Sequence, residues 1–126
     1  HKKLKKGKSY KYYVQAYQEI GGKRIVIAKS LDVYSTTKGG KYGNVSKVSA
    51  KKTRISVKAG KKAKLSAKAA GKKLNKTAKK MRYVSSNPSV AKVSSKGIIT
   101  GKKRGSCTVY CIARNGVYKK IKVTTK

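Results

Sequence analysis

The stretch at residues 83–123 constrains the fold more than any other, because short β-prone runs alternate there with turn residues. Pro88 fixes its own φ and keeps Asn87 out of the helical region, which predicts a turn at residues 85–89. Short Val and Ile runs separated by Ser and Gly follow as far as Gly101. This alternation predicts a series of short strands.

The end of the chain predicts a hairpin. Residues 107–113 and 117–125 alternate on either side of Arg114-Asn115-Gly116. Asn-Gly between two alternating runs is a strong hairpin signal, because both residues tolerate positive φ. Residues 54–57 and 63–69 alternate as well, and no long segment combines helical periodicity with helix caps. The sequence therefore predicts an all-β fold.

This C-terminal part resembles the bacterial immunoglobulin-like group 2 domain, a small sandwich repeated in many bacterial surface proteins. The resemblance runs from roughly Thr53 to Lys126, and its motifs are Tyr83 with Ser85-Ser86-Asn87-Pro88, Val90-Ala91-x-Val93, Gly97-Ile98-Ile99-Thr100-Gly101, Gly105, Thr108-Val109 and Ile121-Lys122-Val123. Many members of the family have a larger aromatic residue at the position of Tyr83. The resemblance implies an immunoglobulin-like β-sandwich at residues 46–126.

The N-terminal part, residues 4–37, resembles the last third of a fibronectin type III domain. Leu4, Gly7 and Tyr10 match the Leu-x-x-Gly-x-x-Tyr motif, which in that family makes a tyrosine corner before a Tyr-x-Val-x-Ala strand. Residues 12–16 match that strand, and Gly21-Gly22-Lys23 predicts a turn after it. The resemblance implies a partial fibronectin type III-like β-hairpin ahead of the sandwich.

The expected organisation has three parts: the partial hairpin at 1–37, a Gly-rich linker at 38–45 and the sandwich at 46–126. A hairpin without a partner sheet is marginally stable in water. Either its upstream half was cut away, or other domains or chains complete it. The chain begins at His1 instead of Met, which indicates a fragment or a processed piece.

Charge is the most extreme feature of the composition. The 126 residues include 36 Lys and Arg against 2 Asp and Glu, for a net charge of +34. A chain with this charge attracts polyanions by releasing their counterions, and the affinity falls as salt rises. The alternative is that Lys occupies the solvated faces of alternating strands and only keeps the protein soluble.

The densest basic cluster predicts where a polyanion binds. The cluster lies in the loop at residues 70–80, and a basic turn after Gly101 is expected to join it. The candidate residues are Lys72, Lys73, Lys76, Lys79, Lys80, Lys102, Lys103 and Arg104. Flexible Lys side chains act as point charges and do not offer the bidentate geometry of Arg. We therefore expect binding to teichoic acid, glycosaminoglycan or nucleic acid without sequence choice.

The two cysteines are predicted to pack in the protein interior and to take no part in a disulfide or a metal site. Cys107 and Cys111 lie four residues apart on one predicted strand, so they face the same side at a separation of about 13 Å. A disulfide needs a much shorter distance, so we expect two reduced, buried thiols. A metal site would need more ligands than these cysteines and His1 supply. No metal site and no cofactor is expected.

Enzyme chemistry lacks the necessary residues. Acid–base catalysis by carboxylates needs two placed acids, and the chain has Glu19 beside a predicted turn and Asp32 as a surface charge of a predicted strand. A catalytic triad needs a histidine, and the sole histidine is His1. Calcium would need several carboxylates. The sequence therefore predicts a protein that is not an enzyme.

The sequence also argues against a membrane-spanning helix and against a specific nucleic-acid-binding module. No apolar run is long enough to cross a membrane as a helix. No specific nucleic-acid motif is present, and Tyr10 and Tyr12, which alternate with Val14 and Ala16, are expected to pack inward. We predict a structural or adhesion module, a spacer or stalk, of a bacterial cell-surface or secreted protein. The alternative is an electrostatic anchor that binds cell-wall or host polyanions.

Overall fold

The computed structural model describes residues 3–126, which form thirteen β-strands and no helix. The strands are β1 Ser9–Tyr12, β2 Gln15–Ile20, β3 Lys23–Lys29, β4 Val33–Thr36, β5 Lys47–Ala50, β6 Arg54–Val57, β7 Lys62–Lys64, β8 Ala67–Ala70, β9 Met81–Ser85, β10 Ala91–Val93, β11 Ile98–Gly101, β12 Gly105–Ala113 and β13 Tyr118–Thr125. This confirms the predicted all-β fold class.

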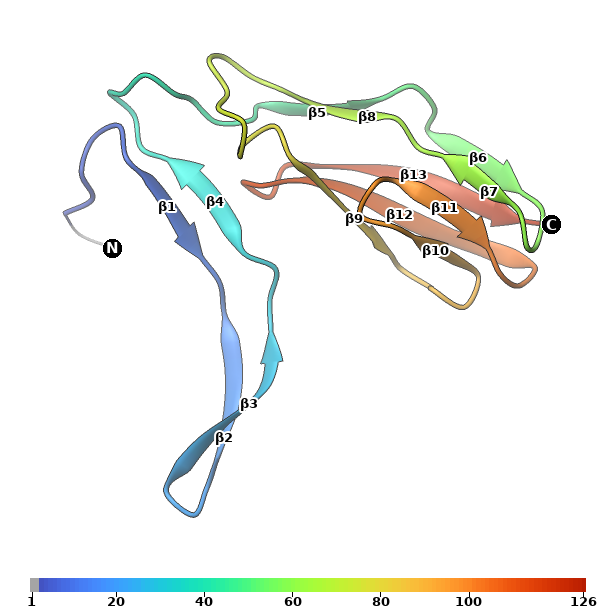
Figure 1. Ribbon diagram of the computed structural model, residues 1–126, viewed down its shortest axis with the longest axis horizontal. Helices are drawn as coiled ribbons and strands as arrows, with labels where there is room; N and C mark the ends of the chain where they lie inside the picture. The colour runs from blue at the N-terminus through green and yellow to red at the C-terminus, as the bar shows by residue number, and fades with distance from the viewer. Residues whose placement is uncertain (1–2) are drawn as a thin grey trace.

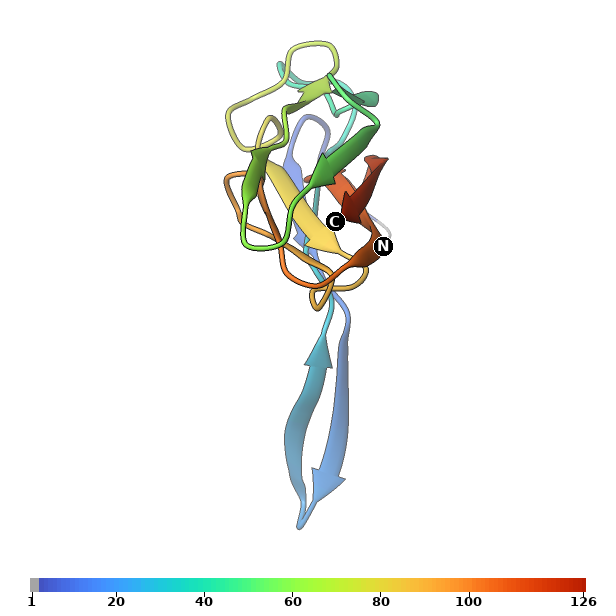
Figure 2. The ribbon, with the colours of Figure 1, turned by 90° about the vertical axis from the view of Figure 1, so that its right-hand side faces the viewer.

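The first four strands form one long antiparallel hairpin. β1 pairs with β4, and β2 pairs with β3. Gly21 and Gly22 both have positive φ and close the turn, as the sequence predicts. The hairpin projects away from the rest of the protein, and its tip lies far from both sheets of the sandwich (Figures 1 and 2).

The remaining strands build a sandwich of two sheets. One sheet has the order β6-β13-β12-β9, and the facing sheet has the order β10-β11-β7. The strands β5 and β8 form a separate two-stranded ribbon at the end nearest the hairpin (Figure 1). β6 and β13 pair in parallel, whereas all other pairs are antiparallel. The immunoglobulin-like sandwich implied by the family resemblance is confirmed.

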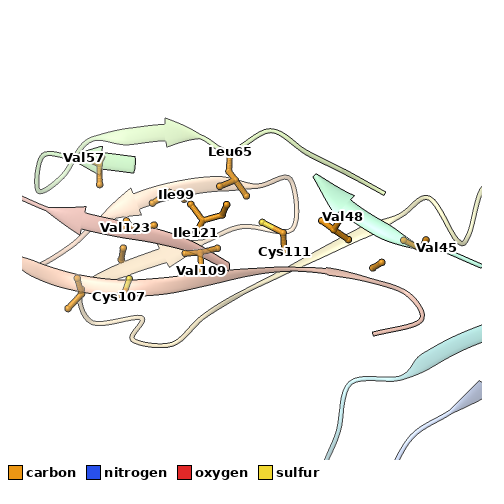
Figure 3. Close-up of a cluster of buried hydrophobic side chains, with 13 residues drawn as sticks. Val45, Val48, Val57, Leu65, Ile99, Cys107, Val109, Cys111, Ile121 and Val123 are labelled. Carbon is orange, nitrogen blue, oxygen red and sulfur yellow. The ribbon is translucent and has the colours of Figure 1, made fainter. Parts of the chain in front are cut away.

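Strand β12 supplies the centre of the core. Its residues alternate in burial, and Cys107, Val109, Cys111 and Ala113 are all buried. Ile121 and Val123 of β13 lie beside them, and Leu65 and Ile99 come from the facing side (Figure 3). Both cysteines are free and buried, which confirms the prediction of reduced thiols that pack as small apolar side chains.

Two details of the predicted core and its strands are corrected. The strand pattern predicts one buried core of Tyr83, Val93, Ile99, Val109 and Ile121, but Tyr83 and Val93 are only partly buried and pack against the core from its margin. The alternating run at 63–69 is interrupted, because β7 pairs with β11 and β8 pairs with β5. Between them Leu65 N–H bonds to the carbonyl of Gly97 at 2.8 Å. The chain therefore moves from one sheet to a separate ribbon within a run that reads as one strand.

In the hairpin, the inward packing predicted for Tyr10 and Tyr12 is wrong. Both rings remain accessible and stack on each other with centroids 6.4 Å apart. No second sheet covers this face in the part of the chain that the structure describes. Alternation alone gives the face that a side chain shares with its neighbours, and burial requires an opposing layer.

Candidate functional site

The basic loop between β8 and β9 has an ordered backbone and exposed lysines. Asn75 closes a turn, because its Oδ1 accepts the Ala78 N–H at 2.8 Å and its carbonyl accepts the Lys79 N–H at 3.2 Å. Ala78 is buried, and Asn75 Nδ2 donates to the hydroxyl of Tyr34 at 2.9 Å, which ties the loop to β4. The five predicted lysines, Lys72, Lys73, Lys76, Lys79 and Lys80, are all exposed. The loop therefore presents five cations on a backbone held by turn hydrogen bonds.

The second predicted cluster lies elsewhere. Lys102, Lys103 and Arg104 are exposed in the turn between β11 and β12. Gly105 begins β12 opposite Thr125, whereas Ala113 ends β12 opposite Met81, which directly follows the basic loop. The eight steps between these residues of β12 span about 26 Å. The structure does not bring the two clusters together, and they lie at opposite ends of the sandwich (Figure 1).

A basic groove that the sequence analysis did not identify lies between β6 and β7. It has a volume of about 330 Å³ and is lined partly by Ile55, Ala63 and Leu65. Four basic residues also line it: Lys51, Lys52, Arg54 and Lys64. Arg54 lies on β6 and Lys64 on β7, which belong to different sheets, and Lys51 and Lys52 lie in the segment between β5 and β6, so only the folded sandwich assembles them. The sequence feature that could have indicated this groove is the basic residue on each of the two strands. The same feature is also typical of a strand face that is exposed to solvent.

The two carboxylates do not neutralise any of these basic surfaces. Glu19 forms an exposed ion pair with Arg24 at 3.4 Å in the hairpin. Asp32, predicted as a surface charge of a strand, lies between β3 and β4 and is partly buried. Its Oδ2 accepts a hydrogen bond from Arg114 at 2.6 Å, and its Oδ1 lies 3.5 Å from Arg82. Asp32 therefore acts at the junction between the hairpin and the sandwich.

Further hydrogen bonds hold this junction. Arg82 Nη1 donates to the carbonyl of Asp32 at 2.6 Å, and the Tyr34 N–H donates to the carbonyl of Arg114 at 2.7 Å. Asn44 Oδ1 and Nδ2 bond the N–H and the carbonyl of Thr36, each at 2.7 Å. Burial first, and the nearby Arg114 second, lower the pKa of Arg82. The junction is thus polar and specific.

The described residues show no grouping suited to holding a metal ion. Residues 3–126 contain no cluster of three or more His, Cys, Asp or Glu that could hold an ion. His1, considered above as a ligand, lies outside the described residues. Burial raises the pKa of Cys111 to about 11, so its thiol stays protonated and unreactive near neutral pH. In the same residues no helix is long and apolar enough to cross a membrane.

The hairpin contains one contact that the fibronectin resemblance predicts. The Lys5 N–H donates to the hydroxyl of Tyr10 at 3.0 Å, which is the bond of a tyrosine corner. No family model covers this part of the chain, so its assignment to a fibronectin type III-like domain stays a prediction.

The comparison with known families covers the sandwich. Residues 44–124 match the family model of the bacterial Ig-like domain (group 2). Domains of that family are generally non-catalytic structural domains and occur in bacterial surface or secreted proteins. The comparison with curated proteins gave no match. Since the family match spans well over half of the 126 residues, the chain belongs to the bacterial immunoglobulin-like domain family, group 2.

Proposed function

We propose that the chain is a non-enzymatic spacer or stalk module of a bacterial cell-surface or secreted protein. The observation that carries this proposal is the parallel pairing of β6 with β13. The sandwich is entered near Asn44 at the end beside the hairpin, and the chain leaves it after Thr125 at the opposite end (Figure 1). A tensile load applied to these two points therefore runs along the module.

The β6–β13 pair is loaded in shear by such a pull. The two strands run in the same direction, so tension on the start of β6 and on the end of β13 slides one strand along the other. The pair is extended beyond the ladder by bonds from Lys122 N–H to Thr53 O at 2.9 Å and from Ala59 N–H to Lys126 O at 2.8 Å. In shear these bonds carry the load together, whereas in peeling they break one after another. This arrangement suits a module that transmits force.

Single-molecule force spectroscopy tests the proposal. Attachment at residues 44 and 126 should load the pair in shear, and attachment at residues 59 and 126 should peel the same pair from one end. We expect a clearly higher unfolding force in the first geometry, because unfolding under load is governed by the unfolding barrier along the pulling direction. Equal forces in both geometries would contradict a load-bearing role.

A second candidate function is electrostatic anchoring to a polyanion. Two observations favour it: the groove between β6 and β7 and the loop between β8 and β9 both present basic side chains without carboxylate partners. Wall teichoic acid, host glycosaminoglycan and extracellular nucleic acid all fit this chemistry, since each is a flexible or linear polyanion. No feature of either surface selects a base sequence, so nucleic acid would bind non-specifically.

Salt titration with heparin, teichoic acid and duplex DNA tests the anchor. For DNA, log K should fall against log salt with a slope near −0.9 per phosphate neutralised. Three variants then locate the surface: Gln at all five loop lysines, Gln at the four basic groove positions, and Gln at Lys102, Lys103 and Arg104. The first two should flatten the salt slope more than the third. Loss of all binding by physiological salt would instead favour the plain spacer.

A further inference from the structure

The exposed apolar side chains are concentrated on the hairpin. Ten of the fourteen large exposed hydrophobic residues in the described chain lie between Tyr12 and Val33. Val14 is 74% exposed and Ile27 is 65% exposed, which are values for side chains without a packing layer. Such a concentration on one projecting element marks an interaction surface.

The hairpin also has strand edges without partners. β2 and β3 form a two-stranded sheet, so one edge of each strand has no neighbour in the described structure. Natural proteins protect free edges with charged side chains, especially Lys, or with β-bulges. Apart from β2 and β4, every edge strand among residues 3–126 carries Lys or Arg: β1, β3, β5, β6, β7, β8, β9 and β10.

Strand β2 is the exposed exception. Residues 12–22 are the longest stretch of the sequence without Lys or Arg. The edge of β4 is covered, because Tyr34 bonds Arg114 and Thr36 bonds Asn44. On the other side of the hairpin, β3 carries Lys23, Arg24 and Lys29 and has an irregular register opposite Ala16 and Tyr17. In the described chain the free edge of β2 carries no Lys or Arg, and its one charged residue, Glu19, is paired with Arg24 of β3.

We propose that two copies of the chain pair antiparallel through their β2 edges and form one four-stranded sheet. A two-fold axis through Tyr17 places that ring opposite Tyr17 of the second copy. The same register places Gln15 opposite Glu19 and Ala16 opposite Gln18 of the second copy. The two Tyr17 rings then face each other, Gln15 faces the polar Glu19, Gln18 faces the small Ala16, and no like charges are directly opposed within β2.

The charge distribution of the chain supports a second copy of the chain as the partner of the β2 edge. Residues 12–35 carry three basic and two acidic residues, a net charge of +1, although the whole chain carries +34. Antiparallel pairing about Tyr17 sends the two basic sandwiches to opposite ends of the new sheet. Each sandwich begins near the β1–β4 pair, so the two are separated by roughly 35 Å, several Debye lengths at physiological salt. Residual repulsion predicts that added salt strengthens the dimer.

A lipid surface fits this hairpin less well. The tip carries Glu19, Lys23 and Arg24, which would enter the membrane first. A two-stranded ribbon also leaves backbone N–H and C=O groups of both edges unpaired in hydrocarbon, at a cost of several kcal/mol each. A second β2 strand supplies partners for one of these edges, so the edge favours a protein strand.

Sedimentation equilibrium of the 126-residue chain tests the proposal at increasing salt. We expect a monomer–dimer equilibrium that shifts to dimer as salt rises. Tyr17→Lys should raise the dimer Kd by about tenfold or more, because it opposes two Lys residues on the axis. Ser95→Lys adds the same charge to an exposed turn of the sandwich and should leave the Kd unchanged. A monomer at all concentrations and salts, or a dimer insensitive to Tyr17→Lys, would overturn the proposal.

Cysteine cross-linking tests the register separately. The Tyr17→Cys variant should form a disulfide-linked dimer under mild oxidation, because the two Cβ atoms on the axis lie about 5 Å apart. The Gln15→Cys variant should not, since its two copies are offset by four residues, about 13 Å. The native Cys107 and Cys111 are buried and do not compete. Equal cross-linking of both variants would exclude the register centred on Tyr17.

Binding of the chain to vesicles of anionic and neutral lipid tests the lipid alternative. If Val14→Ser abolishes vesicle binding and Tyr17→Lys does not, the surface binds lipid and the dimer proposal is overturned.

Discussion

The hairpin and the sandwich are built from the same local signals and end in different physical states. Both have alternating strands and glycine-containing turns, and both were predicted from those patterns. The sandwich places two sheets face to face, so Ile99, Val109 and Ile121 become fully buried. The hairpin has one layer, so its isoleucines and valines stay exposed. The comparison shows that a strand pattern specifies a surface, and a second layer turns that surface into a core.

The bonds that unite the two regions are polar. Asp32, Arg82 and Arg114 link the base of the hairpin to the end of the sandwich, and Asn44 bonds the backbone of Thr36. No comparable apolar cluster joins the two regions in the described residues, since the core cluster begins at Val45. The hairpin is therefore oriented by charge and hydrogen bonds, whereas the sandwich is stabilised by apolar burial.

The largest difference between the hairpin and the sandwich should appear in the rates of amide hydrogen exchange. In dilute solution the amides of β2 and β3 should exchange through local opening at a small fraction of the global unfolding free energy. The amides of β12 and β13 should exchange only through global unfolding, which costs about 5–15 kcal/mol in a typical domain. Mass spectrometry of peptides from residues 12–33 and 105–125 measures the difference. Equally strong protection of both in a proven monomer would show that the hairpin is part of one cooperative unit.

Truncation of a buried side chain should destabilise the sandwich, whereas truncation of an exposed side chain of the hairpin should change the stability very little. Ile121→Ala deletes methylene groups from a fully buried site and should destabilise the sandwich by about 2–5 kcal/mol. Ile27→Ala removes a similar volume from an exposed site and should change the free energy of unfolding by less than about 0.5 kcal/mol. Denaturant midpoints of the two variants compare them directly. Similar losses would show that Ile27 packs against something in solution.

The junction should respond to loss of its single carboxylate. Asp32→Asn leaves Arg82 and Arg114 close together without a counter-charge, so we expect a loss of about 1–3 kcal/mol of stability in the junction. Exchange should accelerate at residues 33–36 and 44–46 and should remain slow in β12. Glu19→Gln removes the exposed partner of Arg24 and is the matched control, with an effect below about 1 kcal/mol. An unchanged junction in Asp32→Asn would mean that the backbone bonds of Tyr34 and Thr36 suffice.

Much of the sandwich could be predicted from the sequence, because its signals are local. The Asn115-Gly116 turn and the Pro88 turn follow from backbone preferences, and the family motifs add the order of the strands. The partial burial of Tyr83 could not be predicted, because it depends on how far the edge strand β9 reaches over the core. The role of Asp32 depends on two arginines 50 and 82 positions away. The groove between β6 and β7 likewise requires two sheets to be in place.

The position of the basic clusters illustrates the same limit. Both clusters were predicted as exposed turns, and both are exposed. Their mutual distance follows from the length and direction of β12, which separates them. A sequence pattern identifies charged turns, whereas only the topology states which turns share an end of a sandwich. Whether either cluster binds a polyanion stays a prediction.

The most gradual expected effect, spread over two pH units, concerns a buried thiol of the sandwich. Burial raises the pKa of Cys111 from 9.0 to about 11, so the native state keeps the proton where the unfolded chain would release it. The unfolded state then binds fewer protons than the native state between these values, and stability falls as pH rises through that window. The loss should be on the order of 1 kcal/mol per pH unit at its steepest.

Cys111→Ala lacks this linkage, so the stability difference between wild type and variant should narrow between pH 9 and 11. Burial first, and Cys111 second, raise the pKa of Tyr83, so the same substitution lowers the pKa of Tyr83 and acts in the same direction. Urea midpoints at several pH values measure the difference, and thiol labelling at pH 9 gives an independent check, since the native thiol should react slowly and the unfolded one quickly. A constant difference between the two proteins over this pH range would show that Cys111 titrates normally and that the core admits water beside β12.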